Sequence, residues 1–188
     1  MPAEMYVPAF YLKQRFAMTA NRFEVVVANP DGSEGASLAW AQQKRLAFKE
    51  QVTFYADQAR TQPVFGFRAR QVVDLGAGYD VVDGAGRPLG YFKKDFGASL
   101  LRSTFHVEGP GLRGTGTERS KGGALMRRFV AGVVPIHFDF TADDGRMLFT
   151  VERQMKLRDR YTVSVLDPEV DFRLAAGIAV GLDVLMDR

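Results

Sequence analysis

The C-terminal part of the chain contains a run that is apolar on every side of a helix, and few folds can accommodate such a segment. No charged residue occurs from position 174 to 182, and the apolar positions around it cover the whole helical wheel: Phe172, Leu174, Ile178, Val180, Leu182, Val184 and Leu185. A helix of this kind has to be buried, either in a membrane or in protein. A membrane span needs about 20 predominantly apolar residues, whereas Arg173 and Asp183 bracket this run closely.

The sequence therefore predicts a buried core helix at about residues 168–187. Asp167 is suited to be its N-cap, and Pro168 is suited to the first helical position. Small residues alternate with the large ones and would keep the helix slim enough to be closely surrounded: Ala175, Ala176, Gly177, Ala179 and Gly181.

Most of the remaining chain follows a period of two, which is typical of strands. Aromatic and β-branched residues fill short segments such as 10–16, 23–27, 52–55, 64–68, 100–107, 136–140, 147–153 and 161–165, with Asp, Asn, Gly and Pro turns between them. Roughly a dozen strands can be counted, which favours an all-β antiparallel barrel or sandwich. The segment 41–51 remains ambiguous between a strand and a helix.

The strand count and the helix fit one architecture. A closed sheet of about eight strands is filled by its own side chains, so a barrel that encloses a helix has to be wider. We therefore expect an all-β fold, an antiparallel barrel of about twelve strands around the hydrophobic C-terminal α-helix. Residues 1–188 are expected to form one domain, which suits the length of the chain.

Three stretches repeat one pattern, in which a strand, a turn and a returning strand end in basic residues. They begin at Phe23, Tyr79 and Phe138. If these units lie side by side, their basic residues form a cationic face that attracts phosphate headgroups. The other interpretation is that they protect sheet edges and keep the barrel soluble. The candidate headgroup-binding residues are Lys44, Arg45, Lys49, Lys93, Lys94, Arg102, Arg153, Lys156 and Arg158.

Residues 74–78, DLGAG, resemble the first motif of S-adenosylmethionine-dependent methyltransferases. A cofactor-binding Gly-x-Gly should open a helix. Here a β-branched stretch and a second turn, Asp83 to Gly86, follow instead. We interpret the glycines as corners of a barrel and expect no catalytic residues and no enzyme activity.

His137 and Asp139 should share one strand face, with Glu152 on a neighbouring strand. A metal site is conceivable there, but polar residues on a solvent-facing strand are the commoner explanation, and we expect neither a metal nor a cofactor. The chain has no cysteine, which excludes disulfides and thiolate zinc sites. The N-terminus shows no secretory pattern. A net charge of only +3 does not indicate a nucleic-acid partner.

Taken together, the basic hairpin GYFKKDFGASLLRSTFHV (90–107), the hairpin HFDFTADDGRMLFTVERQ (137–154) and the terminal helix resemble the LURP-one-related proteins. The resemblance runs from about Met5 to Arg188. This family belongs with the phospholipid scramblases and the tubby C-terminal domains in a tubby-like superfamily. The resemblance implies a twelve-stranded barrel threaded by the helix. The chain departs from the scramblases because it has no cysteine cluster, and DPEVD (167–171) lacks the alternating acidic ligands of a calcium loop.

For function we expect a non-enzymatic binding module that recognises acidic phospholipid or phosphoinositide headgroups through basic barrel residues. The alternative is a protein-interaction scaffold with no lipid role, and a scramblase-like activity comes third. The expected partner is an anionic membrane surface or a protein. We expect a monomer in the cytoplasm, where it could attach peripherally to a membrane.

Overall fold

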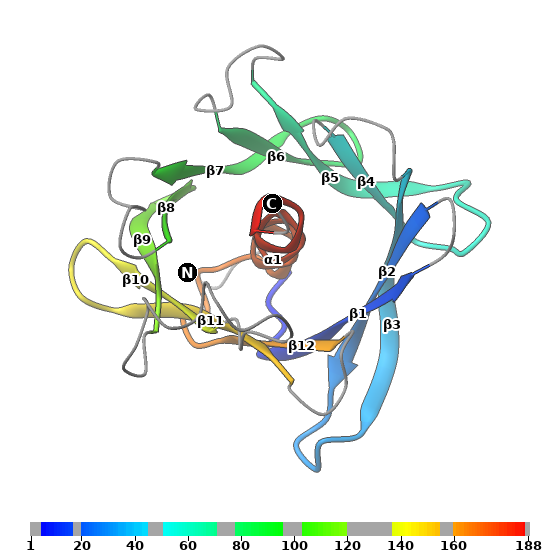
Figure 1. Cartoon of the computed structure of the whole chain (residues 1–188), viewed down its shortest axis with the longest axis horizontal. Coiled ribbons are helices and arrows are strands. Elements are labelled where there is room, and N and C mark those ends of the chain that lie inside the picture. Colours follow the sequence, from blue (N-terminus) through cyan, green and yellow to red (C-terminus); the bar gives the residue numbers. More distant parts are fainter. Residues whose placement is uncertain are drawn as a thin grey trace, which may run out of the picture.

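The computed structural model describes residues 5–16, 20–44, 51–70, 78–95, 103–119, 137–154 and 160–186. These residues form a closed antiparallel barrel around one helix, as the sequence predicts (Figure 1). The strands are β1 (Ala9–Phe16), β2 (Ala20–Ala28), β3 (Glu34–Lys44), β4 (Gln51–Tyr55), β5 (Pro63–Ala69), β6 (Tyr79–Asp83), β7 (Pro88–Asp95), β8 (Thr104–Gly109), β9 (Leu112–Glu118), β10 (His137–Ala142), β11 (Met147–Arg153) and β12 (Arg160–Val165). The helix is α1 (Phe172–Met186).

Each strand pairs with the strands before and after it in the chain, and β12 pairs with β1 to close the barrel. The segment that was ambiguous between strand and helix continues β3 as far as Lys44 and resumes at Gln51 in β4, so its described part is a strand. Residues 45–50 lie outside the described residues.

The side chains of each strand alternate between the lumen and the outer face. In β10, Phe138, Phe140 and Ala142 are buried, while His137 and Asp139 between them are partly exposed. β12 follows the same rule with Tyr161, Val163 and Val165 inside. This period of two is why short aromatic and β-branched segments of the sequence become strands with one apolar face.

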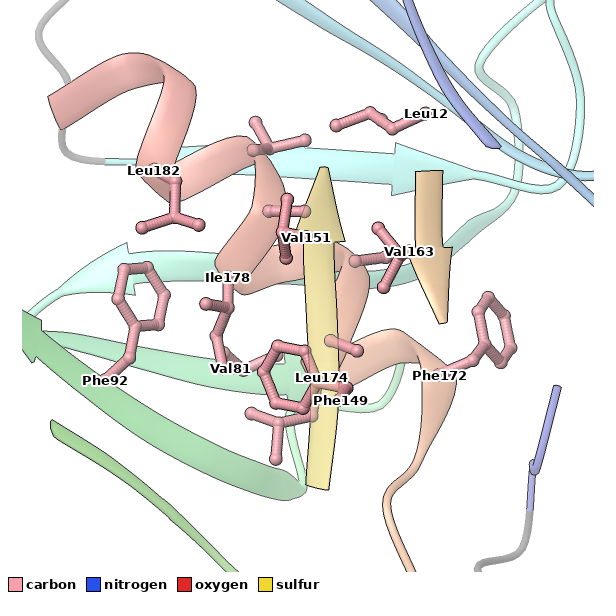
Figure 2. Close-up of a cluster of buried hydrophobic side chains, with 14 of the residues drawn as sticks. Leu12, Val81, Phe92, Phe149, Val151, Val163, Phe172, Leu174, Ile178 and Leu182 are labelled. Carbon is pink, nitrogen blue, oxygen red and sulfur yellow. The ribbon is translucent and has the colours of Figure 1, made fainter. Parts of the chain in front are cut away.

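α1 fills the lumen, where Leu174, Ile178 and Leu182 lie among strand residues that include Val81, Phe92 and Phe149 (Figures 1 and 2). All of these side chains are at most 1% exposed. At the start of the helix, the ring of Phe172 makes edge contacts with Phe10 and Phe65, at centroid distances of 6.2 and 5.9 Å. Burying one such side chain stabilises the fold by about 1.5–3 kcal/mol, so the helix supplies a large part of the core.

The start of the helix differs from the prediction. Asp167 and Pro168 lie in a turn, in which Asp167 accepts a hydrogen bond from the N–H of Glu169 (2.9 Å). The N-cap is Asp171, whose carboxylate accepts from the N–H of Arg173 at 2.9 Å. Asp171 also receives the Arg173 guanidinium, with 2.6 Å between Nη2 and Oδ2. Both Asp residues accept from the N–H two positions on, but only after Asp171 does the chain continue as a helix.

Small residues on the helix meet large residues on the strands, and large residues on the helix meet small ones on the strands. A Cβ placed on Gly181 would lie 2.5 Å from the ring of Phe92, and that ring is held between Phe67 and Tyr79. In the opposite sense, Leu174 of the helix lies against Gly90 and Gly109 of β7 and β8. The small residues of α1 therefore set how closely the barrel can surround it, as the sequence indicates.

This packing predicts different effects for two helix glycines. Gly181→Ala should overpack the contact with Phe92 at a cost of about 1–3 kcal/mol. Gly177→Ala is the matched control, because its Cβ would meet Val81 at an ordinary 3.4 Å. Both variants gain about 1 kcal/mol of helix propensity, so the difference between their urea unfolding free energies isolates the overpacking. Equal stabilities would contradict a tightly enclosed helix.

Candidate functional site

Antiparallel pairing sends alternate strand ends to opposite rims of the barrel. One rim carries the turns at 29–33, 56–62, 84–87 and 143–146 together with the segment 166–171 that leads into α1; it is called here the acidic rim. At the other rim β3, β7 and β11 end, and β4, β8 and β12 begin; it is called here the basic rim.

The four predicted headgroup-binding residues that the structure describes lie toward the basic rim. Lys44 is the last residue of β3, Lys93 and Lys94 lie near the end of β7, and Arg153 ends β11. The other five lie outside the described residues, in the connections between β3 and β4, between β7 and β8, and between β11 and β12: Arg45, Lys49, Arg102, Lys156 and Arg158.

The three basic units do not lie side by side, so the condition for one shared cationic face is not met. β4 and β5 separate the β2–β3 unit from the β6–β7 unit, and β8 and β9 separate that unit from the β10–β11 unit (Figure 1). The units are thus spaced around the circumference of the barrel. Their shared feature is the rim, so the strand ends that carry basic residues are distributed around a ring.

The described basic side chains divide between the two faces of the sheet. Lys93 pairs in register with His106, and both are on the outer face; His106 in turn contacts Asp95 (Nε2–Oδ2, 3.1 Å). Lys94 pairs with the buried Phe105 and so belongs to the inner face. The sequence does not separate these neighbouring lysines, but the register does.

Arg153 also belongs to the inner face at this rim. It pairs with Tyr161, and its guanidinium carbon is 5.7 Å from the centroid of that ring, within the range of a cation–π contact. Lys94 and Arg153 are both partly exposed and line the mouth of the lumen on the side of the basic rim.

The lumen becomes polar just below this mouth. Asp183 of α1 is 7% exposed and accepts hydrogen bonds from the Tyr161 hydroxyl at 2.5 Å and from Gln14 Nε2 at 2.8 Å. A buried carboxylate is tolerated only when such donors replace water. Sequence reasoning missed this group. Its signal was a single Asp interrupting the apolar run of the helix.

Removing one donor should therefore destabilise the barrel. Tyr161→Phe leaves the Asp183 carboxylate with an unmet hydrogen bond in a buried site, and we expect a loss of about 1–3 kcal/mol in unfolding free energy by urea denaturation. Tyr6→Phe is the control, because the Tyr6 hydroxyl donates to the Val165 carbonyl at a partly exposed site. Equal losses in the two variants would mean that the buried carboxylate carries no special cost.

The acidic rim gathers carboxylates in its turns. Arg146 donates to Asp144 (Nε–Oδ2, 2.8 Å), and this bond, together with the Arg146 N–H, holds the pKa of that carboxyl below its ordinary value. Asp83 likewise accepts from the backbone N–H of Arg87 at 2.8 Å, and its pKa is lowered. Arg146 also contacts Asp167. Asp83 and Asp144 are therefore ionised at neutral pH, and the acidic stretch before the helix makes ion pairs with Arg146 and Arg173.

The histidine cluster on the outer face is an ion-pair network. His137, Asp139 and Glu152 lie on paired strands, as the alternation predicts, but Arg119 takes both oxygens of Asp139 at 2.7 and 2.5 Å. Within the described ranges, no three His, Asp or Glu side chains are arranged to hold a metal ion.

The glycine motif leads into a strand. Residues 74–77 lie outside the described residues, but Gly78 is buried with φ +76° and is followed directly by β6. A cofactor loop would need a helix at this place. The turn after β6 forms as expected, with Gly86 N–H bonded to the Asp83 carbonyl at 3.0 Å.

A closed twelve-stranded antiparallel barrel threaded by a hydrophobic helix defines the class of tubby-like barrels. Within that class the family is also defined: the family model described as LURP-one-related matches residues 39–183, and the chain belongs to this family. Barrels of this family are generally non-enzymatic. A search of curated proteins finds no significant match. In the described part of the chain, α1 falls short of what a membrane-crossing helix requires.

Proposed function

We propose that the chain is a non-enzymatic binding module that attaches peripherally to anionic phospholipid surfaces through its basic rim. The observation that supports this most is the separation of charge along the barrel axis. The described basic residues Lys44, Lys93, Lys94 and Arg153 lie toward one rim, and hydrogen-bonded carboxylates such as Asp83 and Asp144 lie at the other.

The shape of the site suits a flat partner. A ring of cations around a rim can meet a planar surface at several points, which a patch on the curved side of a barrel cannot do. Each Lys or Arg near an anionic surface contributes about 1 kcal/mol. Several weak contacts of this kind add up to stable but reversible attachment.

The acidic rim is too far away to cancel this attraction. β7 has eight residues, which at roughly 3.3 Å each and with the usual tilt of barrel strands separate the rims by about 20 Å. The Debye length at physiological salt is about 8 Å. A membrane at the basic rim therefore experiences mainly the cations nearest to it.

The attachment should depend on charge more than on apolar insertion. The large hydrophobic side chains that the described residues expose most are Met5, Tyr6, Met147 and Leu166, and all belong to strand ends and segments at the acidic rim. Binding should thus weaken steeply as salt rises.

We expect the chain to co-sediment with phosphatidylcholine vesicles that contain phosphatidylserine, and not with phosphatidylcholine vesicles. Lys93→Glu should lower the partition coefficient roughly 10–30-fold, because reversing one charge removes about 2 kcal/mol. Lys93 is preferable to Lys94 because it lies on the outer face, away from the packed lumen.

The matched control is Arg113→Glu, which makes the same change of charge on β9 beside the acidic rim, at a side chain that is 70% exposed. It should bind like the unchanged protein. Equal loss in both variants would point to net charge instead of a site, and binding that is indifferent to salt would contradict the proposal.

A protein-interaction role is the second candidate, and the exposed apolar side chains at the acidic rim favour it. Met147 and Leu166 belong to neighbouring backbone segments, since the Leu166 N–H donates to the Leu148 carbonyl at 2.9 Å. A partner bound there should be lost in Leu166→Ser and retained in Lys93→Glu. The two variants therefore separate the two candidates.

A further inference from the structure

A hollow of about 240 Å³ lies on the outer face of the barrel, over β1, β2 and β3 and beneath the β4–β5 turn. Its polar lining includes Arg22, Trp40, Gln42, Gln58 and Arg60. None of the predicted headgroup-binding residues lines it, and it is separate from the lumen. It is therefore a second place at which this barrel could bind a ligand.

On one wall of the hollow, the charged side chains are already paired with one another. Lys13, Glu24 and Trp40 are neighbours across the outer faces of the three strands. The Lys13 ammonium lies 2.8 Å from Glu34 and 3.3 Å from Glu24, and the hydrogen bond that it donates to Glu34 raises the pKa of Lys13. Ser37 donates to the other oxygen of Glu24 at 2.7 Å. Little of the Lys13 charge is left for a ligand.

The opposite wall is the β4–β5 turn, and it is held in place before any ligand arrives. The Asp57 carboxylate accepts from the N–H groups of Thr61 and Gln62, both at 3.1 Å, and from the Thr61 hydroxyl at 3.0 Å. Arg60 takes a left-handed conformation with φ +62°, which a residue with a side chain adopts at some cost. Its Nη1 then donates to Gln42 Oε1 across the hollow at 2.9 Å.

The lining groups that remain available to a ligand are hydrogen-bond donors and the aromatic surface of Trp40. Among the described residues, no carboxylate pairs with Arg22, and Arg60 keeps N–H groups beyond the one that bonds Gln42. The indole N–H of Trp40 is buried and has no acceptor within the described part of the chain.

We propose that this hollow binds a small planar aromatic carboxylate. The aromatic ring of the ligand packs against Trp40, and its carboxylate accepts from Arg22 and Arg60, whose planar guanidinium groups suit that geometry. The volume equals that of about eight waters, which suits a single-ring acid. A headgroup with several phosphates is disfavoured, because the Glu24 carboxylate lines the hollow and the Lys13 charge is already balanced by Glu24 and Glu34. This ligand therefore differs from the one proposed for the basic rim.

The chain offers a direct probe, because Trp40 is the one tryptophan of the sequence. Protein labelled with 5-fluorotryptophan should give a single ¹⁹F resonance, and a titration with benzoate should shift it in a saturable way. Benzamide keeps the ring without the charge, and acetate keeps the charge without the ring. Benzamide should bind at least about tenfold more weakly, since a charge-assisted hydrogen bond contributes about 1.5–3 kcal/mol. Acetate should also bind more weakly, because it lacks the ring that packs against Trp40.

Arg22→Gln should weaken benzoate about tenfold or more while leaving the β4–β5 turn intact, and Arg60→Gln should do the same from the other wall. Trp40→Phe, followed by saturation-transfer NMR on the benzoate signals, tests the indole. Lys93→Glu is the control and should leave benzoate binding unchanged. The proposal is independent of lipid binding, so loss of vesicle binding would not affect it.

Three results would overturn the inference. One is equal shifts with benzoate and benzamide, which would mean that the guanidinium groups select nothing. The other is no shift at millimolar benzoate in protein whose ¹⁹F resonance and circular dichroism show it to be folded. Unchanged benzoate affinity in both Arg22→Gln and Arg60→Gln would likewise place the ligand elsewhere.

Discussion

The whole structure depends on the enclosure of α1. A sheet of twelve strands closes around a lumen too wide to be filled by its own side chains, so the barrel has a dry core only because a helix that is apolar on every side occupies it. The reverse also holds, because such a helix needs a surface of apolar side chains in every direction. The fit is reciprocal in detail: Gly181 makes room for Phe92, and Gly90 and Gly109 make room for Leu174.

This enclosure decides where binding can occur. With the lumen committed to packing, the positions that remain are the two rims and the outer face. An antiparallel meander sends every second connection to the same rim, so any charge bias between odd and even connections becomes a separation along the barrel axis.

The features that could be predicted are those that depend on residues close together in the sequence. The period of two, the turn residues and the apolar helix predict the class, the closure and the central position of α1. Features that depend on distant segments were missed. The three basic units repeat along the chain, but their spacing in the closed sheet places them around a ring and not beside one another. Gln14 and Asp183 meet across 169 positions, and the hollow near Trp40 joins three strands to a turn.

The basic rim and the core helix are physically connected. Arg153 lies over the ring of Tyr161, the Tyr161 hydroxyl donates to Asp183, and Asp183 belongs to α1. Between Arg173 at its start and Asp183 near its end, the helix presents only apolar side chains and glycines to the lumen. An anion bound as proposed would, by drawing Arg153 outward, weaken a contact on which the buried carboxylate indirectly relies, and the proposed binding would then be coupled to the stability of the helix in its barrel. Lys93, on the outer face, has no such connection through the lumen. The inner and outer cations of one rim should therefore differ in kind: the inner ones couple binding to folding, and the outer ones act by charge.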